Sequence, residues 1–482
     1  MRGDCVAKMT YFCTSNKVYI QFYEDTHLST MENTLLTDPI PHLIRKIAVP
    51  ASIGFFFNTM YNVVDTYFGG LQSTEALSAL SLSFPVFFLI IAVGSGIASG
   101  LAVLIAHALG ERDHEKAKHY AVQGLSFGFG ISIILTVIGL SVAPSLFRFL
   151  GATDAYLSLS LSYMDMIFYG TPAFIFVFLL NAILNATGDT KSFRNFLITG
   201  FFLNFVFNAW FMFGGLGIPA LGLAGVALGT VVVQVIGVVY LLYKVSKAGL
   251  LHAILSLRDF IPDWRVFKEI SAQGFPASLS MMTIALGIFI ITYYISIFGH
   301  GAVAAYGIAT RIEQITLLPL IGLNIAVLTL IGQNNGARQF DRVREVYRRS
   351  LRIGSAVSII ATVFLFAFAK PMMQLFTADL SVTTIGATYL RIAAFVTGGY
   401  MILFMSDSAL RGLKHPMFFL LLGFIRQIIL PATIFTILLK VLHTGIIGIW
   451  WGIFGIVWGA AFVAFFYVRH ILAKTLGLGE SQ

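Results

Sequence analysis

One acidic residue, Asp65, stands inside an apolar stretch from His42 to Gly70 that is long enough to cross a bilayer. A charge at that depth is costly, so a carboxylate there usually has a function. Three residues precede it at helical spacings of three, four and seven and share its face of a helix: Asn62, Tyr61 and Asn58. One carboxylate, two amides and a phenol on one face predict a binding site for a proton or a small cation.

The same stretch contains a proline, Pro50, fifteen residues before Asp65. Inside a helix, proline removes one backbone hydrogen bond and favours a kink. We therefore predict a helix that carries an ionisable group and a hinge at Pro50. A static ion pair is the alternative role for Asp65, but the first six apolar segments hold no Lys or Arg at a similar depth.

Four asparagines in later apolar segments form two pairs at a spacing of four residues, Asn181 with Asn185 and Asn204 with Asn208. If these helices pack toward Asp65, the amides could complete a cation shell or bind the protonated carboxyl. The alternative is that each amide simply joins neighbouring helices. The grouping of four favours a pocket made of Asp65, Asn181, Asn204 and Asn208.

The composition is that of a membrane protein, with 57% hydrophobic and only 11% charged residues among 482. The formal net charge is +9, but the basic residues fall between apolar segments, so they indicate topology rather than a nucleic-acid partner. Both cysteines, Cys5 and Cys13, lie in the polar N-terminal stretch, which leaves no disulfide framework and no CxxC metal site. We expect no metal and no cofactor.

Apolar runs between charged or Gly/Pro-containing breaks predict an all-α polytopic protein with twelve membrane spans. The predicted spans are 43–69, 75–107, 117–146, 155–186, 192–213, 222–246, 265–299, 302–335, 343–369, 382–410, 415–440 and 446–473. Loops on the N-terminal side of the membrane then hold 22 Lys and Arg, and loops on the other side hold three. Cytoplasmic loops carry the positive excess, so both termini are expected in the cytoplasm.

A repeat with an offset of 226 residues relates the two halves of the chain. Matching segments include Pro50-Ala51-Ser52 with Pro276-Ala277-Ser278, Gly96 with Gly322, and Gly110 with Gly336. The repeat predicts two six-helix bundles of the same orientation, related by a pseudo-twofold axis along the membrane normal. Asp65 corresponds to Ile291, which confines the carboxylate to the first bundle.

The predicted organisation has five parts. They are a polar N-terminal extension, 1–40, a first six-helix lobe, 41–247, a cytoplasmic linker, 248–264, a second lobe, 265–474, and a C-terminal tail, 475–482. Residues 1–30 lack the apolar core of a signal peptide, and we expect the natural start at Met31, with a disordered tail as the alternative.

The second half has its own acidic residues, and Glu313 and Asp407 form a possible second site. Each has an arginine nearby in sequence, Arg311 and Arg411. Both signs of charge lie close together there, so static ion pairs are the favoured interpretation.

Three segments resemble the multidrug and toxic compound extrusion (MATE) transporters, closest to their DinF-like branch. These segments are YNVVDTYFGG, from position 61, NAILNATGDTK, from position 181, and PLIGLNIAVLTLIGQNNGAR, from position 319. The resemblance covers the chain from about Pro41 onward. It implies twelve helices in two lobes around an alternately opening cavity, and export of organic cations and other drugs against protons or sodium ions.

The resemblance also assigns residues. The family's helix-one acid falls on Asp65, and the helix-five asparagine that faces it falls on Asn204. Some DinF-like members carry a second acid one turn later, where this chain has Asn208. A site with one carboxylate is neutralised fully by one proton, so proton coupling is favoured over sodium.

The sequence thus predicts a monomeric proton-coupled exporter of drugs and organic cations in a bacterial inner membrane, in contact with lipid and not an enzyme. Protonation of Asp65 and bending at Pro50 would couple to substrate release. The alternatives are sodium-coupled drug antiport and a lipid-linked precursor flippase, which would need several cations in its cavity. A membrane-embedded enzyme or receptor is disfavoured by the whole-length repeat and by the lack of a paired nucleophile and base.

Overall fold

A computed structural model of the chain describes residues 33–149, 152, 154–215, 217–251 and 257–479. Twelve helical spans in this part are long and apolar enough to cross a membrane, which confirms the predicted all-α fold class. The predicted start at Met31 lies outside the described residues. The spans are α2 (Ile40–Gln72), α3 (Thr74–Gly110), α4 (His114–Phe149), α5 (Asp154–Ala186), α6 (Lys191–Phe213), α7 (Leu223–Lys247), α8 (Trp264–Ser296), α9 (His300–Gly336), α10 (Phe340–Gln374), α11 (Leu380–Gly412), α12 to α13 (Met417–Phe424 and Leu430–Lys440) and α14 (Gly445–Gly479).

Short elements and caps lie at the ends of the spans. A single turn, α1 (Thr34–Thr37), precedes α2, and the 3₁₀ turn η1 (Leu257–Phe260) lies in the predicted linker. The side chain of Asp263 caps α8 by accepting a hydrogen bond from the backbone of Arg265 at 3.0 Å. His119 of α4 also contacts the Asp263 carboxylate at 3.1 Å, and this bond holds the pKa of Asp263 below its ordinary value.

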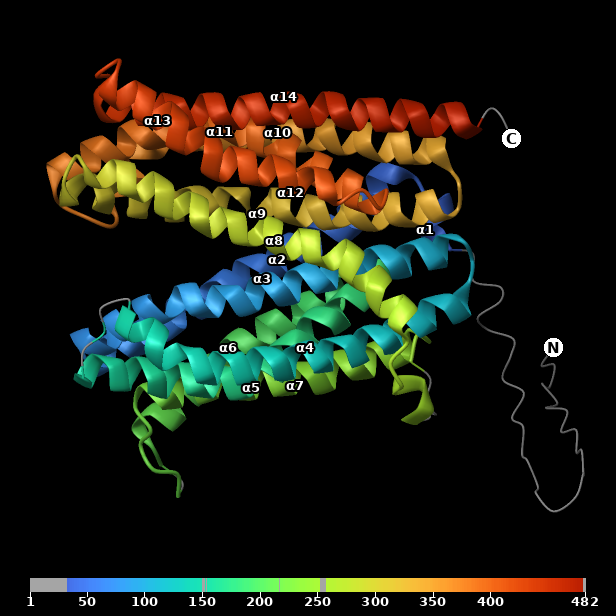
Figure 1. Ribbon diagram of the computed structural model, residues 1–482, viewed down its shortest axis with the longest axis horizontal. Helices are drawn as coiled ribbons and strands as arrows, with labels where there is room; N and C mark the ends of the chain where they lie inside the picture. Colours follow the sequence, from blue (N-terminus) through green and yellow to red (C-terminus); the bar gives the residue numbers. More distant parts are fainter. Residues whose placement is uncertain (1–32, 150–151, 153, 216, 252–256, 480–482) are drawn as a thin grey trace, which may run out of the picture.

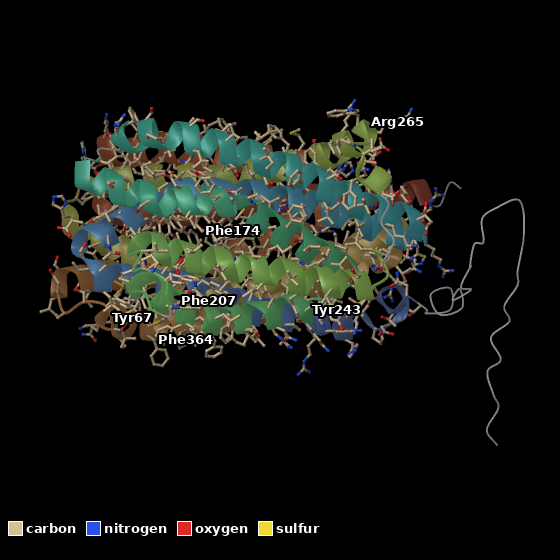
Figure 2. The ribbon with its side chains drawn as sticks, turned by 90° about the horizontal axis from the view of Figure 1, so that it is seen from below. Tyr67, Phe174, Phe207, Tyr243, Arg265 and Phe364 are labelled. Atoms are coloured by element: carbon tan, nitrogen blue, oxygen red, sulfur yellow. The ribbon has the colours of Figure 1, made fainter. Side chains whose placement is uncertain are left out.

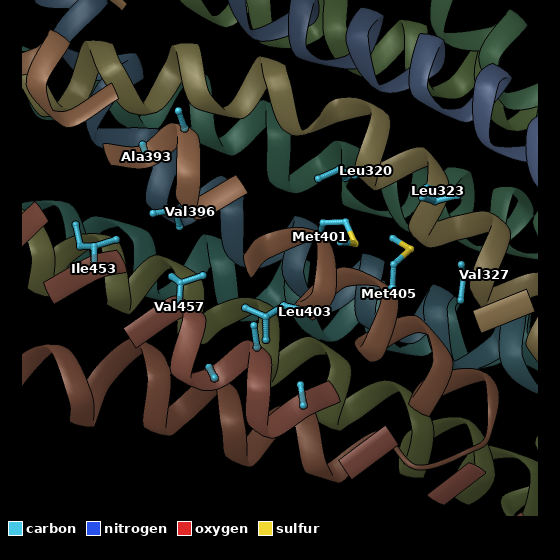
Figure 3. Close-up of a cluster of buried hydrophobic side chains, with 14 of the residues drawn as sticks. Leu320, Leu323, Val327, Ala393, Val396, Met401, Leu403, Met405, Ile453 and Val457 are labelled. Carbon is cyan, nitrogen blue, oxygen red and sulfur yellow. The ribbon is translucent and has the colours of Figure 1, made fainter. Parts of the chain in front are cut away.

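The helices form two lobes, which lie one above the other in Figure 1. One hydrophobic core is built mainly from α3 to α7, and the other mainly from α9 to α14. Figure 3 shows part of the second core, where Met401 and Met405 of α11 lie among Leu320, Leu323 and Val327 of α9. Buried apolar side chains packed in this way account for the separate cohesion of each lobe.

Two helices are shared between the cores. In α2, Leu43 and Ile47 belong to the second core, whereas Tyr61 belongs to the first. In α8, Ile270 belongs to the first core and Ile295 to the second, and Figure 1 shows α8 running from the lower lobe to the upper one. The predicted lobes 41–247 and 265–474 therefore exchange the first halves of α2 and α8.

Glycines allow the shared helices to approach the opposite lobe closely. A Cβ atom added at Gly96 of α3 would lie 2.1 Å from Ser278 Oγ of α8, and one at Gly322 of α9 would lie 2.1 Å from Ser52 Oγ of α2. Real Cβ atoms do not approach other heavy atoms so closely, so only glycine fits at either place. The two contacts are equivalent under the 226-residue offset, which places them symmetrically about the predicted pseudo-twofold axis.

The eleventh span, predicted as one uninterrupted helix, contains a π-turn, η2 (Ile425–Ile429), between α12 and α13. The backbone N–H of Leu430 donates to the carbonyl of Ile425, five residues earlier. Pro431 has no N–H and its ring crowds the preceding turn, which explains why the helix widens here. Arg426 and Gln427 lie within this turn.

Large apolar side chains also cover the outside of the bundle. Tyr67, Tyr243 and Phe364 lie at its periphery in Figure 2 and are 55%, 52% and 46% exposed. Such a surface would be insoluble in water but matches the acyl chains and interfaces of a bilayer. The molecule is a multi-pass membrane protein.

Candidate functional site

The carboxylate of Asp65 lies on α2, where it faces α6 and α7 of the first lobe. Asn208 Nδ2 of α6 donates a hydrogen bond to Asp65 Oδ1 at 2.7 Å. The hydroxyl of Thr230, on α7, lies 3.3 Å from Oδ1 and 3.2 Å from Oδ2 and donates to the same group. Three helices thus meet at one half-buried carboxylate.

Asn204 completes the cluster from one turn earlier on α6. Its Nδ2 donates to Thr230 Oγ1 at 2.9 Å, and its amide exchanges two bonds of 3.3 Å with the amide of Asn208. Both asparagines are fully buried, at 0% exposure. Asn204, Asn208 and Thr230 are joined to one another by these hydrogen bonds, and each bond orients the next donor. The cluster is therefore preorganised around the carboxylate of Asp65.

The charge of Asp65 has only neutral partners. Within the described part of the chain, no Lys, Arg or His lies close enough to Asp65 to form an ion pair. A carboxylate held by neutral donors can gain or lose a proton without breaking an ion pair. The residues that the structure describes include no group of three or more His, Cys, Asp and Glu side chains that could hold a metal ion.

The other residues predicted on this face of α2 lie in different surroundings. Tyr61 is buried against Gly200, and its hydroxyl has no hydrogen-bond partner among the described residues. Asn58 and Asn62 are exposed, and the bonds of the Asp65 cluster do not include them. The buried face of the helix holds residues 61, 64 and 68, and the two amides lie outside that face.

Asn181 of α5 is also outside the hydrogen-bonded cluster. It is 9% exposed, and its Oδ1 is buried without a hydrogen-bond partner in the described structure. Thr230, by contrast, is a cluster member that the sequence did not single out. Thr230 stands directly before the segment Val231–Val239, which is apolar apart from Gln234, and a threonine in a membrane helix commonly bonds its own backbone, so nothing marked it as a site residue.

The repeat shows that this cluster exists in one lobe only. The positions that correspond to Asp65, Asn204, Asn208 and Thr230 are all aliphatic: Ile291, Leu430, Ile434 and Ile456. An apolar replacement of all four members removes the polar network as a unit. The asymmetry predicted from Asp65 alone thus extends to every residue that contacts it.

The possible second site is divided between two separate interactions. The hydroxyl of Tyr389 donates to Glu313 Oε2 at 2.7 Å, and Glu313 is only 6% exposed. Arg411 Nε donates to Asp407 Oδ1 at 2.8 Å, which is the expected ion pair. The pair expected for Glu313 was wrong, because Arg311 is exposed on another face of α9.

Comparisons with known proteins agree with this architecture. The MatE family model matches residues 50–210 and 276–436, so both ends of the two matches are offset by the 226 residues of the repeat. The probable multidrug resistance protein NorM of Thermotoga maritima is 25% identical over 431 residues, which cover 88% of this chain and 92% of NorM. A FAD transporter of Shewanella oneidensis is 26% identical over 399 residues, covering 82% and 87%.

The fold is also that of a solved structure, described as the outward-facing conformation of a multidrug resistance MATE family transporter of the MOP superfamily. The TM-score is 0.86 at 26% identity, with 92% of this chain and 99% of that chain covered. Assignment to the DinF-like branch stays a prediction. The family model matches well over half of the residues, with one match in each lobe, and the chain therefore belongs to the MatE family of membrane transporters.

Proposed function

We propose that this chain exports drugs and other organic cations across a bacterial cytoplasmic membrane by antiport with protons, and that Asp65 carries the proton. The observation that supports the proposal is the set of neutral donors, Asn208 and Thr230, around a carboxylate in a membrane-spanning helix. The relatives are named for different cargo, so the proposal rests on the coupling pocket and not on the cargo.

Protonation would change what the Asp65 carboxyl can do in this cluster. One of its oxygens becomes a donor, and a hydrogen bond that Asn208 or Thr230 donates to that oxygen is lost. The segment of α2 that holds Asp65 then re-packs by bending at Pro50, and the state that binds drug becomes less favourable. Loss of the proton restores the bonds and the binding state.

The decisive experiment is drug-driven proton movement in proteoliposomes that contain the purified protein, with and without sodium. We expect a proton signal that depends on drug and is unaffected by sodium. A signal that appears only with sodium would establish sodium-coupled antiport instead. No ion movement in either condition would favour the lipid-linked precursor flippase.

The identity of the coupling ion can be tested at Asn208. Its Nδ2 lies 2.7 Å from Asp65 Oδ1, so Asn208→Asp places two carboxylates in contact. Two such groups cannot both stay ionised without a cation between them. We expect the variant to transport more slowly with protons alone and to regain activity with sodium. Asn208→Ala is the control, and an equal response of both variants to sodium would contradict the expectation.

The hinge at Pro50 makes a second prediction. Pro50 lies between Ala48, which packs in the second core, and Tyr61, which packs in the first. Pro50→Ala restores the backbone donor and stiffens α2, so we expect export to slow by roughly tenfold while drug binding persists.

Pro276→Ala is the matched control, because Pro276 is the repeat counterpart of Pro50 and lies on α8, a helix that contributes no residue to the carboxylate cluster. Its export rate should stay near that of the wild type. Equal rates for Pro50→Ala and wild type would remove bending at Pro50 from the mechanism.

A further inference from the structure

A cavity of about 310 Å³ lies inside the second lobe, and Asp65 is not among its lining residues. Side chains of α8, α9, α11, the α12–η2 segment and α14 line it. Its apolar wall includes Ile284, Ile288, Phe404, Leu403 and Ile453, of which Figure 3 shows the last two beside the core of the lobe. The volume suits one small and largely apolar molecule.

Two arginines line this cavity, and their charges are compensated differently. Arg411 binds Asp407, and its Nη1 also donates to Ser99 Oγ of α3 at 3.2 Å. The guanidinium of Arg426 lies 5.9 Å from the centre of the Tyr400 ring and donates to the Tyr400 hydroxyl. Within the described ranges no carboxylate is at ion-pair distance from it, and the charge of Asp407 acts on it only from further away. Arg426 therefore brings to the cavity wall a positive charge that no carboxylate contacts.

A guanidinium in the interior of a lobe is costly when no anion is in contact with it. A bound anion would offset that cost, and the planar donors of arginine match the two oxygens of a carboxylate. Gln427, the next residue of the π-turn, also lines the cavity and adds an amide donor. Turns of this type frequently mark functional sites in helices.

The repeat shows how the second lobe makes room for these groups. Arg426 corresponds to Gly200 of the first lobe, and Gly287 corresponds to Tyr61. In the first lobe, the tyrosine ring covers the glycine, whereas in the second, a Cβ at Gly287 would lie 2.7 Å from Gln427 Oε1. The large residue of the contact is thus on the first helix of the first lobe, as Tyr61, but on the eleventh span in the second lobe, as Arg426. The first lobe has glycine, Gly200, where the second has the guanidinium.

Carboxylates in the same lining limit the charge of a ligand. Glu313 is held by Tyr389, and Asp407 is already paired with Arg411. These groups would repel a second negative charge on a ligand bound at Arg426. A molecule with one negative group and an apolar body fits this wall better than a diphosphate.

We propose that the second-lobe cavity is a binding site for small amphipathic monocarboxylates, with the carboxylate on Arg426 and the apolar body against the aliphatic wall. The site is separate from the Asp65 cluster. It extends the accepted ligands to anionic and zwitterionic molecules, which the carboxylate of Asp65 would repel.

The test compares two ligands of nearly equal shape, 4-(trifluoromethyl)benzoate and 4-(trifluoromethyl)benzamide, by fluorine NMR titration. The protein is held in phosphatidylcholine nanodiscs, and empty nanodiscs correct for partition into lipid. We expect the wild type to bind the benzoate about 10- to 100-fold more tightly than the benzamide, the range for a charge-assisted pair. Arg426→Gln should abolish this preference, and Arg426→Lys should retain part of it.

Two further variants keep the outcome clear. Arg311→Gln removes an exposed arginine from the same lobe and should bind the benzoate as the wild type does. The titration measures binding and not proton movement, so a failure of the proton mechanism would not affect this result. Arg426→Met replaces Arg426→Gln if the latter does not fold. Equal affinity of the wild type for both ligands, or an unchanged preference in the neutral variants, would overturn the proposal.

Discussion

Replacing Asp65 with asparagine is expected to reduce drug-driven proton movement to the background of empty liposomes, a loss of about 100-fold or more. Asparagine has nearly the same shape, and its oxygen can still accept hydrogen bonds from Asn208 and Thr230. It cannot exchange a proton, so the two states of the cluster no longer differ, and a ligand without differential affinity shifts no equilibrium. The fluorescence of a pH-sensitive dye in proteoliposomes measures the loss of proton movement.

Asp165→Asn provides the matched control for this result. Asp165 is a partly exposed carboxylate of α5 in the same lobe, and no hydrogen bond or ion pair involves it in the described structure. That variant should export at the wild-type rate, and both proteins should melt close to the wild type in a thermal-shift assay. Coupled export that persists in Asp65→Asn would exclude Asp65 as the proton carrier.

The second large effect is expected from Gly96→Val at the crossing of α3 and α8. The new Cβ atom would lie 2.4 Å from the backbone nitrogen of Ser278, a position that no side-chain rotation relieves. Overpacking of about 1–3 kcal/mol should lower the unfolding midpoint by about 1–3 °C in a chain of this length. The same penalty changes the population of the state with this contact by roughly 5- to 150-fold, so export should fall accordingly.

Gly130→Val on α4 separates this effect from the general cost of valine in a helix. A Cβ at Gly130 meets no atom within 4 Å, and the residue is exposed on the outer surface. Its unfolding midpoint and export rate should stay near those of the wild type. Similar losses in both variants would show that the close crossing at Gly96 is not responsible.

Much of the fold could be predicted because both halves of the sequence show the same pattern of apolar spans. Apolar runs give the spans, and the 226-residue offset pairs Gly96 with Gly322. The offset alone did not show that these glycines contact Ser278 and Ser52. A repeat identifies equivalent positions in the two halves, but it does not say which residues of one half touch the other half. The partner of a glycine depends on helix crossing, which only the packed structure defines.

The candidate site was predictable in part for a similar reason. Asp65 and Asn208 stand out because charged and amide side chains are rare in membrane helices. Thr230 does not stand out, since hydroxyls can bond their own helix, and Asn62 was misplaced because several residues of α2 compete to face the lobe. Arg426, which no carboxylate contacts among the described residues, lies in a π-turn that no spacing rule anticipates.

The sharing of α2 and α8 between the two cores has a consequence for how the chain is built. Leu43 and Ile47 reach their core only after the second half of the chain exists, and Asn33 bonds Gln333, 300 positions later. Contacts of such long range close late in folding. Neither half can therefore finish its interior during synthesis before the other is made, and the molecule completes its two lobes together as one cooperative unit.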